Sequence, residues 1–285
     1  MMKHILLALC FTAAAFAAPK SFSVAVQGTG TPVILIPGLA SSPATWDSTV
    51  ANYKTQYQFH LVHIAGFAGK APVEPLSLEN VRKELATYIR DNKLDHPVII
   101  GHSLGGFLAL WLASVEPELT GKLVIVDSLP FLPAAMDPAI TVEGAKMFAA
   151  PMRDGMLKEG SGSSNDWLKT MATKPEDIAL LSTWSAKSDR AAVANAMYEL
   201  YTTDLRSELA KIKVPVKVLG TWIAYQQYAS RASVEKNFQT QFAKLSGVEI
   251  MLFDTARHFI MFDDPTGFFA QLDSFLPTSK AAVHE

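Results

Sequence analysis

A serine between glycines is the residue of this chain best suited to nucleophilic chemistry. Residues 101–105 read Gly-His-Ser-Leu-Gly, and a further glycine stands at position 106. This is the pattern G-x-S-x-G, in which small neighbours let the chain turn sharply and leave the hydroxyl of Ser103 able to attack a carbonyl carbon. A serine hydroxyl is a weak nucleophile by itself, so it needs a base, and the base needs a group that orients it.

The segments on either side of Ser103 give the pattern its context. The apolar run PVIIG leads into it, and the apolar stretch FLALWLASVEP follows it. The first is typical of a buried strand and the second of a buried helix. With a strand before it and a helix after it, Ser103 would project above the edge of a sheet, beside backbone N–H groups at the positive end of the helix dipole. The variable position of the motif holds His102.

Apolar runs with the length of strands alternate with helical segments along most of the 285 residues. The run LENVRKELATYIRDNK, for example, places Val81, Leu85, Tyr88 and Ile89 on one helical face. Alternation of this kind predicts one α/β domain with a mainly parallel sheet flanked by helices. The other strand candidates are FSVAVQGTG, PVILIP, FHLVHIAG, KLVIVDS, VPVKVLG and VEIMLFD.

Residues 130–208 interrupt this alternation, because they carry no strand signal and their helical segments are separated by breaks such as KEGSGSSND. We interpret them as a helical cap inserted into a core of residues 18–129 and 209–285. Methionine and aromatic residues of the insertion either form its own core or together make an apolar ceiling over an active site. These residues are Phe131, Met136, Met147, Phe148, Met152, Met156, Trp167, Met171, Trp184 and Met197.

Residues 1–17 have the pattern of a secretory signal peptide. An apolar stretch runs from Ile5 to Phe16, and Ala15 and Ala17 fit an A-x-A cleavage site. The stretch is shorter than the roughly 20 residues that span a bilayer, which favours a signal over a membrane anchor. Cleavage after Ala17 would remove Cys10, the only cysteine. We therefore expect an exported protein, periplasmic or secreted, with no thiol and no stable membrane anchor.

Four segments, in chain order, resemble the α/β-hydrolase superfamily, specifically its esterase-like members with a helical cap. They are VILIPGLASSPATW, IAGFAG, GHSLGG and DTARHFIMFDDP. The resemblance implies that His258, in the last segment, is the base that takes the proton of Ser103. It also implies an oxyanion site of two backbone N–H groups. These belong to Leu39 in the first segment and to Leu104 directly after the nucleophile.

The acid that would orient the histidine is missing from the place where many relatives carry it. Residues 209–234, which include the loop after VPVKVLG, contain no Asp or Glu. Asp127 is the replacement that position favours, because it ends the strand that follows the strand and helix around Ser103. A carboxylate there would fix the tautomer of His258 and stabilise the imidazolium formed during attack.

Other groups near the histidine suggest other arrangements. One alternative is a serine–histidine dyad, without an acid, that is assisted by a neutral group such as Thr221 or Tyr225. Asp263 and Asp264 follow the histidine closely in sequence, but their position before Pro265 predicts that they cap a helix. An aspartate at a strand end can also simply bind loop N–H groups, so a structural role for Asp127 stays open.

These residues predict hydrolysis of a small-molecule ester with an apolar part, through an acyl-enzyme on Ser103. Acyl transfer to another alcohol and lactone cleavage use the same groups and stay open. The missing acid also leaves open a non-catalytic secreted binding protein on a hydrolase fold.

Composition argues against several other classes of protein. The formal net charge is -2 and no long run of Lys and Arg occurs, so no nucleic-acid partner is expected. No histidine pair or carboxylate cluster has the spacing of metal ligands, and no phosphate-binding or dinucleotide fingerprint precedes a helix. The sequence therefore predicts neither metal nor cofactor, and it leaves the oligomeric state open.

Overall fold

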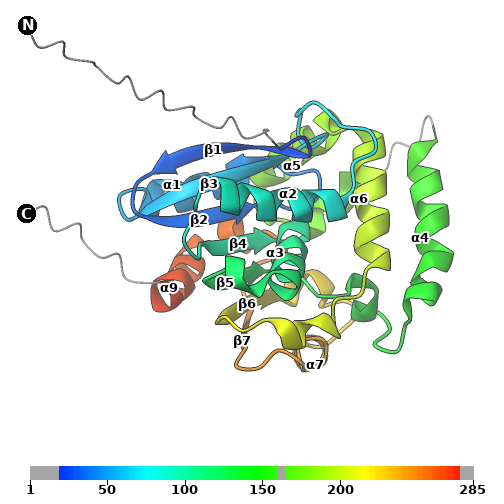
Figure 1. Cartoon of the computed structure of the whole chain (residues 1–285). Coiled ribbons are helices and arrows are strands. Elements are labelled where there is room, and N and C mark those ends of the chain that lie inside the picture. Colours follow the sequence, from blue (N-terminus) through cyan, green and yellow to red (C-terminus); the bar gives the residue numbers. More distant parts are fainter. Residues whose placement is uncertain (1–18, 159–164, 277–285) are drawn as a thin grey trace, which may run out of the picture.

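A computed structural model describes residues 19–158 and 165–276 of the chain. Its centre is a seven-stranded sheet with the strand order β1-β3-β2-β4-β5-β6-β7 (Figure 1). Strand β1 pairs with β3 antiparallel, and every other neighbouring pair is parallel. The expected α/β fold with a mainly parallel sheet is confirmed. The predicted signal peptide, residues 1–17, lies outside the described residues.

The strands and helices alternate along the chain as the sequence predicts. The strands are β1 (Phe22–Gly28), β2 (Thr31–Ile36), β3 (Tyr57–Ile64), β4 (Val98–His102), β5 (Lys122–Val126), β6 (Val216–Thr221) and β7 (Glu249–Phe253). The α-helices are α1 (Asp47–Tyr53), α2 (Leu78–Asp91), α3 (Leu104–Val115), α4 (Val142–Leu157), α5 (Pro175–Lys187), α6 (Arg190–Thr202), α7 (Arg231–Gln241), α8 (Ile260–Asp263) and α9 (Pro265–Phe275). Short 3-10 helices are η1 (Pro43–Trp46), η2 (Pro117–Leu119), η3 (Leu132–Ala135), η4 (Asn165–Thr170), η5 (Glu208–Lys211) and η6 (Ile223–Tyr225).

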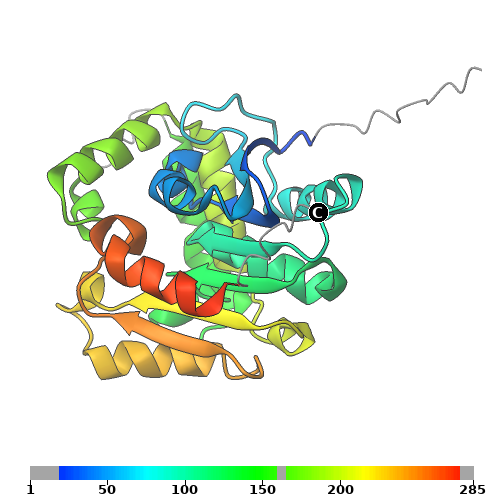
Figure 2. The same ribbon diagram turned by 90° about the vertical axis from the view of Figure 1, so that its left-hand side faces the viewer.

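The central strands are mainly apolar because both faces of the sheet are covered. Successive residues of β2 point to opposite faces, so that Ile34 and Ile36 join one buried cluster while Val33 and Leu35 join the other. The first cluster includes α2, α3 and α7, and the second includes α1 and α9. Figure 2 shows α9, in red, on the opposite side of the sheet from α2 and α3.

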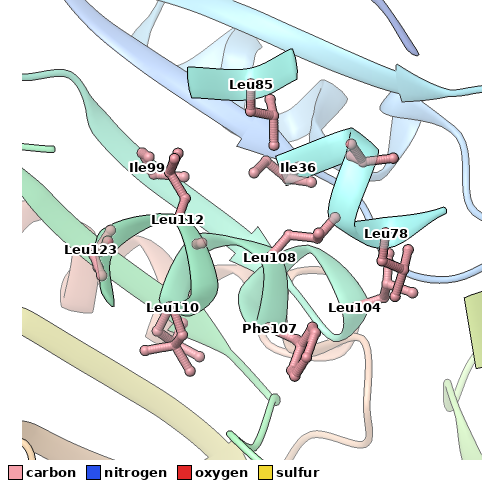
Figure 3. Close-up of a cluster of buried hydrophobic side chains, with 14 of the residues drawn as sticks. Ile36, Leu78, Leu85, Ile99, Leu104, Phe107, Leu108, Leu110, Leu112 and Leu123 are labelled. Carbon is pink, nitrogen blue, oxygen red and sulfur yellow. The ribbon is translucent and has the colours of Figure 1, made fainter. Parts of the chain in front are cut away.

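Helix α3 follows directly after β4 and is buried along most of its length. Its leucines pack against β2, β4, β5 and α2 (Figure 3). This burial fixes the position of the helix N-terminus, and with it the position of the residue that joins β4 to α3. That residue is Ser103, the N-cap of α3.

The segment between β5 and β6 contains helices and no strand among its described residues. Helices α6 and α4 lie side by side beyond the carboxyl ends of β4 and β5 (Figure 1). The Glu199 carboxylate of α6 accepts hydrogen bonds from the Leu78 N–H, at 2.9 Å, and the Glu79 N–H, at 3.3 Å. This pair of bonds fastens α6 to the first turn of α2, whose free N–H groups need acceptors.

The methionines and aromatic residues of this segment do not all have the same surroundings. Phe131 and Trp184 are buried, whereas Met136 and Met147 are 86% and 80% exposed. The two exposed methionines therefore do not belong to a core of the segment. The domain boundaries at residues 130 and 208 stay a prediction.

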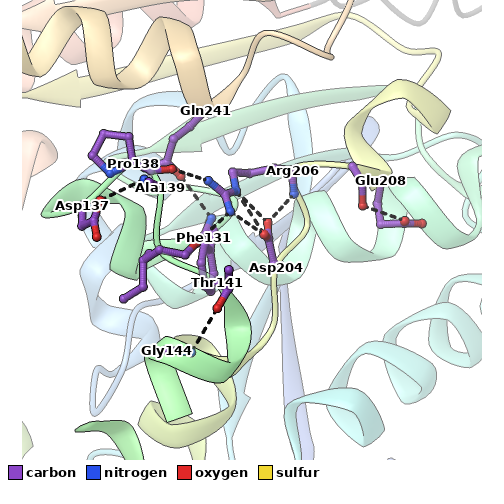
Figure 4. Close-up of polar contacts among 12 residues, drawn as sticks. Phe131, Asp137, Pro138, Ala139, Thr141, Gly144, Asp204, Arg206, Glu208 and Gln241 are labelled. Atoms are coloured by element: carbon purple, nitrogen blue, oxygen red, sulfur yellow. Dashed lines mark hydrogen bonds and ion pairs between the residues drawn. The ribbon is translucent and has the colours of Figure 1, made fainter. Parts of the chain in front are cut away.

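Arg206 joins the beginning and the end of this segment (Figure 4). Its guanidinium donates to the Pro138 carbonyl at 3.1 Å and to the Ile140 carbonyl at 3.3 Å, and it also pairs with Asp204 at 2.7 Å. The same group lies over the ring of Phe131, 4.8 Å from its centroid. The guanidinium of Arg206 therefore links the start of the helical segment, after β5, to its end, before β6.

Candidate active site

Ser103 occupies a backbone conformation that few non-glycine residues adopt. Its φ is 53° and its ψ is -120°, outside the regions that L-residues favour. Its N–H donates to the Val126 carbonyl at the end of β5, at 2.9 Å. A Cβ at Gly105 would lie 2.2 Å from the Ile36 carbonyl oxygen, so only glycine lets the first turn of α3 approach β2 this closely. The sharp turn expected at G-x-S-x-G is present.

Asp127 and His258 meet at the carboxyl edge of the sheet. The Asp127 Oδ2 lies 2.5 Å from His258 Nδ1, although 131 residues separate the two. The aspartate side chain is 6% exposed and the histidine side chain 18%. Asp127 has a φ of 45°, and its N–H donates to the Leu219 carbonyl at 2.6 Å. The turned backbone at the end of β5 thus aims this carboxylate at the histidine.

The second oxygen of Asp127 is also bonded. Asp127 Oδ1 accepts a hydrogen bond from the Thr221 N–H at 3.0 Å. Each carboxylate oxygen therefore has a donor, and the plane of the group is fixed. With Nδ1 occupied by the aspartate, the Nε2 atom of His258 is left for a substrate or for the serine hydroxyl.

Three side chains hold the backbone that carries His258. The Thr221 hydroxyl donates to the Ala256 carbonyl. Asp263 Oδ2 accepts from the Arg257 N–H at 2.8 Å, and His102 Nε2–H donates to the carbonyl of His258 itself at 3.0 Å. These bonds tie residues 256–258, which we call the base loop, to β6, to α8 and to the serine turn.

The prediction that both Asp263 and Asp264 cap a helix is half right. Asp264 accepts from the Gly267 N–H at 2.8 Å and is the N-cap of α9. Asp263 instead accepts from Arg257 and from the N–H and hydroxyl of Thr173. Asp263 lies in α8, one residue before the cap position, and its carboxylate binds residues that precede it in the sequence. It therefore links the base loop to the helical segment.

The two predicted oxyanion donors belong to residues close to Ser103. Leu104 is the first residue of α3, so its N–H has no acceptor within the helix. The loop after β2 approaches from the other side: a Cβ at Gly38 would lie 3.2 Å from Ser103 Cβ. The peptide of Leu39, the next residue, therefore stands beside the serine. An oxyanion site formed by the N–H groups of Leu39 and Leu104 stays a prediction, and the proximity of both residues to Ser103 is compatible with it.

The neutral alternatives to an acid have other roles in the structure. The Thr221 hydroxyl bonds the Ala256 carbonyl and not the imidazole. Burial of its hydroxyl group, together with the charge of Asp127, raises the pKa of Tyr225. Tyr225 therefore stays protonated at neutral pH and can donate a hydrogen bond, but it is no substitute for a carboxylate.

Among the described residues, no hydrogen bond joins the Ser103 hydroxyl to His258. Such bonds are often long in the absence of substrate and tighten when it binds. Within residues 19–158 and 165–276, no group of three His, Cys, Asp or Glu side chains is arranged so that it could bind a metal ion. No helix in the same residues combines the length and apolarity required to cross a membrane.

Comparison with known proteins bears on this arrangement. A sequence profile of the Alpha/beta hydrolase family matches residues 33–272. The chain belongs to this family. The match runs from β2, which leads into the loop of Gly38 and Leu39 (the predicted oxyanion loop), to α9, which follows the histidine. It therefore includes every residue of the site described above.

Several known proteins are distantly similar to the chain. A pimeloyl-[acyl-carrier protein] methyl ester esterase from Nitrosomonas europaea is 24% identical, over 70% of this chain and 79% of the relative. An N-formylmaleamate deformylase from Pseudomonas putida is 21% identical, over 87% of this chain and 90% of the relative. The crystal structure of a hydrolase from Pseudomonas aeruginosa has a TM-score of 0.73 at 17% identity, covering 90% of this chain and 94% of that one.

The sequence did not predict the contacts that several residues of this α/β-hydrolase site make. His102 lies beside the nucleophile, yet the motif treats its position as variable. Thr221 and Gly38 carry no signature of their own, and they matter here because of what they contact. For His102 the partner is 156 residues away in sequence, so no local pattern could have identified it.

Proposed function

We propose that this protein is a serine hydrolase that cleaves a small-molecule ester through an acyl-enzyme on Ser103. The observation that carries the proposal is the 2.5 Å contact between His258 Nδ1 and Asp127 Oδ2 at the sheet edge where Ser103 lies. A histidine held in this way by an ionised carboxylate presents a basic Nε2 and can accept a proton. The relatives named above include an esterase, which supports ester cleavage.

The reaction would proceed in two halves. His258 Nε2 takes the Ser103 proton as the serine oxygen bonds to the ester carbonyl carbon, and the N–H groups of Leu39 and Leu104 stabilise the oxyanion. The carbon–oxygen bond to the alcohol then breaks, and the departing alkoxide receives the proton from His258. A water molecule repeats the attack on the acyl-enzyme, releasing the acid and restoring the serine.

Aromatic side chains next to His258 support a substrate with an apolar part. The ring of Phe259 lies 5.6 Å from that of His258, and it stacks on Phe262 at 5.2 Å. Trp184, from the helical segment, contacts Phe262 at 6.4 Å. Phe259 and Trp184 are themselves buried, so this cluster packs the helical segment against the base loop, and the half-buried Phe262 is the member open to an apolar group of a substrate.

Hydrolysis of p-nitrophenyl esters, from acetate to longer acyl chains, tests the proposal. Wild type should release nitrophenolate, and Ser103→Ala and His258→Ala should fall to the rate of the ester alone. A fluorophosphonate probe should label wild type once, at Ser103. Absence of both turnover and labelling would favour the alternative that the protein is a non-catalytic binding protein. A new ester formed from an added alcohol, in place of free acid, would instead indicate an acyltransferase.

We also propose that the protein is exported. The support is the N-terminal sequence, with its apolar stretch and the alanines at positions 15 and 17. The test is expression of the full chain in a Gram-negative host, followed by fractionation and mass spectrometry. A mature product that begins at Ala18 in the periplasm or medium supports export, whereas an uncleaved chain in the cytoplasm contradicts it.

A further inference from the structure

We propose that His102 is a positioning residue that ties the base loop to the serine turn by donating its Nε2–H to the carbonyl of His258. Its effect on the reaction rests on the function proposed above, because it acts only through Ser103 and His258. The sequence motif leaves position 102 variable, so this role belongs to this chain's own residue.

His102 contacts the base loop and the loop after β2, and it is the residue before Ser103. Its Nε2 lies 3.0 Å from the His258 carbonyl oxygen, and its ring centroid lies 4.5 Å from that of His258. On the same side it lies 4.4 Å from the ring of Phe259. A Cβ at Gly38 would lie 3.0 Å from His102 Nδ1, so the oxyanion loop packs against the other edge of the imidazole. Its own backbone leads directly into Ser103.

The environment of His102 selects one protonation state and one tautomer. The side chain is completely buried, and burial first, then the neighbouring His258, hold the pKa of His102 well below the usual range. The ring is therefore neutral. Because Nε2 carries the proton that bonds the His258 carbonyl, Nδ1 is unprotonated, and it has no hydrogen-bond partner within the described residues.

Neutrality of this side chain matters for the base. During attack His258 becomes a cation, and a second positive charge on a ring 4.5 Å away would oppose that step. A neutral donor avoids this repulsion and still fixes the carbonyl of His258. Fixing that carbonyl restrains the peptide to which the catalytic imidazole is attached, and displacements of about 1 Å at a reacting group can cost on the order of 100-fold in rate.

Three variants separate a donor role from simple filling of space. His102→Gln can place an amide N–H where Nε2 stands, His102→Asn is too short to reach, and His102→Phe keeps the ring without a donor. We expect His102→Phe and His102→Asn to lose roughly 10- to 100-fold in kcat with KM nearly unchanged. His102→Gln should stay within about threefold of wild type. If His102→Phe does not fold, the comparison of kcat between the Gln and Asn variants, both neutral amides, is sufficient to test the donor role.

The rate of fluorophosphonate labelling of Ser103 is measured on the same proteins, because it needs no knowledge of the substrate. Slow labelling in the Asn and Phe variants, with recovery in Gln, supports the proposal. Equal rates in wild type and in either the Asn or the Phe variant overturn it, and so does a folded Gln variant as slow as Asn. If wild type itself is not labelled, the serine hydrolase proposal fails. Crystal structures of wild type and His102→Asn then decide whether the His258 carbonyl shifts, and an unmoved carbonyl overturns the positioning role.

Discussion

Asp127 Oδ2 lies 2.5 Å from His258 Nδ1, and the opposite oxygen of the same carboxylate accepts the Thr221 N–H. The carboxylate that orients the histidine therefore comes from the end of β5, while β6 supplies a backbone donor that orients the carboxylate. The loop after β6 carries no Asp or Glu, but β6 still contributes to the site through the N–H of Thr221. His258 can therefore have a carboxylate partner even though that loop supplies none.

Asp127→Asn should lower kcat by about 10³- to 10⁴-fold without unfolding the protein, because an amide favours the wrong tautomer of His258. The measurement is p-nitrophenyl ester hydrolysis, with circular dichroism to verify the fold. Asp254→Asn is the matched control, since Asp254 is an exposed carboxylate after β7 that pairs with Arg231. It should keep wild-type kcat. Wild-type kcat in Asp127→Asn would show that a dyad carries the reaction.

Gly38→Ala should lower kcat roughly 10- to 100-fold, because the new Cβ would lie 3.0 Å from His102 Nδ1 and 3.2 Å from Ser103 Cβ. The loop must shift to accommodate it, and the N–H of Leu39 moves with the loop. Leu39→Ala is the control, because it retains the N–H and should keep kcat within about threefold. A larger loss of kcat in Leu39→Ala than in Gly38→Ala would show that the N–H of Leu39 is not the oxyanion donor.

Ser103→Gly should be more stable than Ser103→Ala by about 1 kcal/mol, although both are inactive. A φ of 53° with a ψ of -120° strains any residue that has a Cβ. Strain of this kind is of order 1–3 kcal/mol, and the greater flexibility of an unfolded glycine offsets about 0.5–1 kcal/mol of the gain. Urea unfolding of the two variants measures the difference. Lower stability of the glycine variant would mean that the turn stores no strain.

Stability should fall as pH drops below about 6.5, the ordinary pKa of histidine. Burial lowers the pKa of His60 and His102, so the unfolded chain binds protons there that the folded chain does not. Each such group should reduce the free energy of unfolding by up to about 1.4 kcal/mol per pH unit, and the loss ends only below its folded pKa. Urea unfolding between pH 7.5 and pH 5 measures the slope.

A substitution assigns part of this acid sensitivity to one residue. His60 is 3% exposed and bonds the Tyr88 hydroxyl at 2.7 Å, and it lies on β3 away from the candidate site. His60→Gln removes the titrating group and should flatten the pH dependence while leaving kcat near wild type. An unchanged slope would show that His60 takes up a proton in the folded protein as readily as in the unfolded chain.

Arg206→Met should loosen the attachment of the helical segment by removing the bonds to the Pro138 and Ile140 carbonyls. We expect limited proteolysis between residues 130 and 142 to speed up several-fold, because local opening exposes that backbone. Lys211→Met is the control, since Lys211 is exposed and pairs with its neighbour Glu208. Cleavage as slow as in wild type would show that packing alone holds the segment.

The sequence by itself determined the fold and the nucleophile turn. Alternating apolar strands and helices have a period that local sequence carries, and they predicted the mainly parallel sheet. The glycines around Ser103 predicted the sharp turn, because only residues without side chains allow the close approach of α3 to β2. The position of Asp127 at a strand end identified it as a candidate, but position alone did not distinguish a partner of His258 from a loop-binding group.

Tertiary structure decided which side chains meet. Whether Asp127 faces His258, and whether Asp263 binds Arg257 instead of capping α9, depends on strand register and on the path of the base loop. The contact of His102 with the His258 carbonyl joins residues that no local period relates. Hydrogen bonds of this kind need atoms within about 3 Å of each other, and only the packed arrangement of distant segments sets such distances.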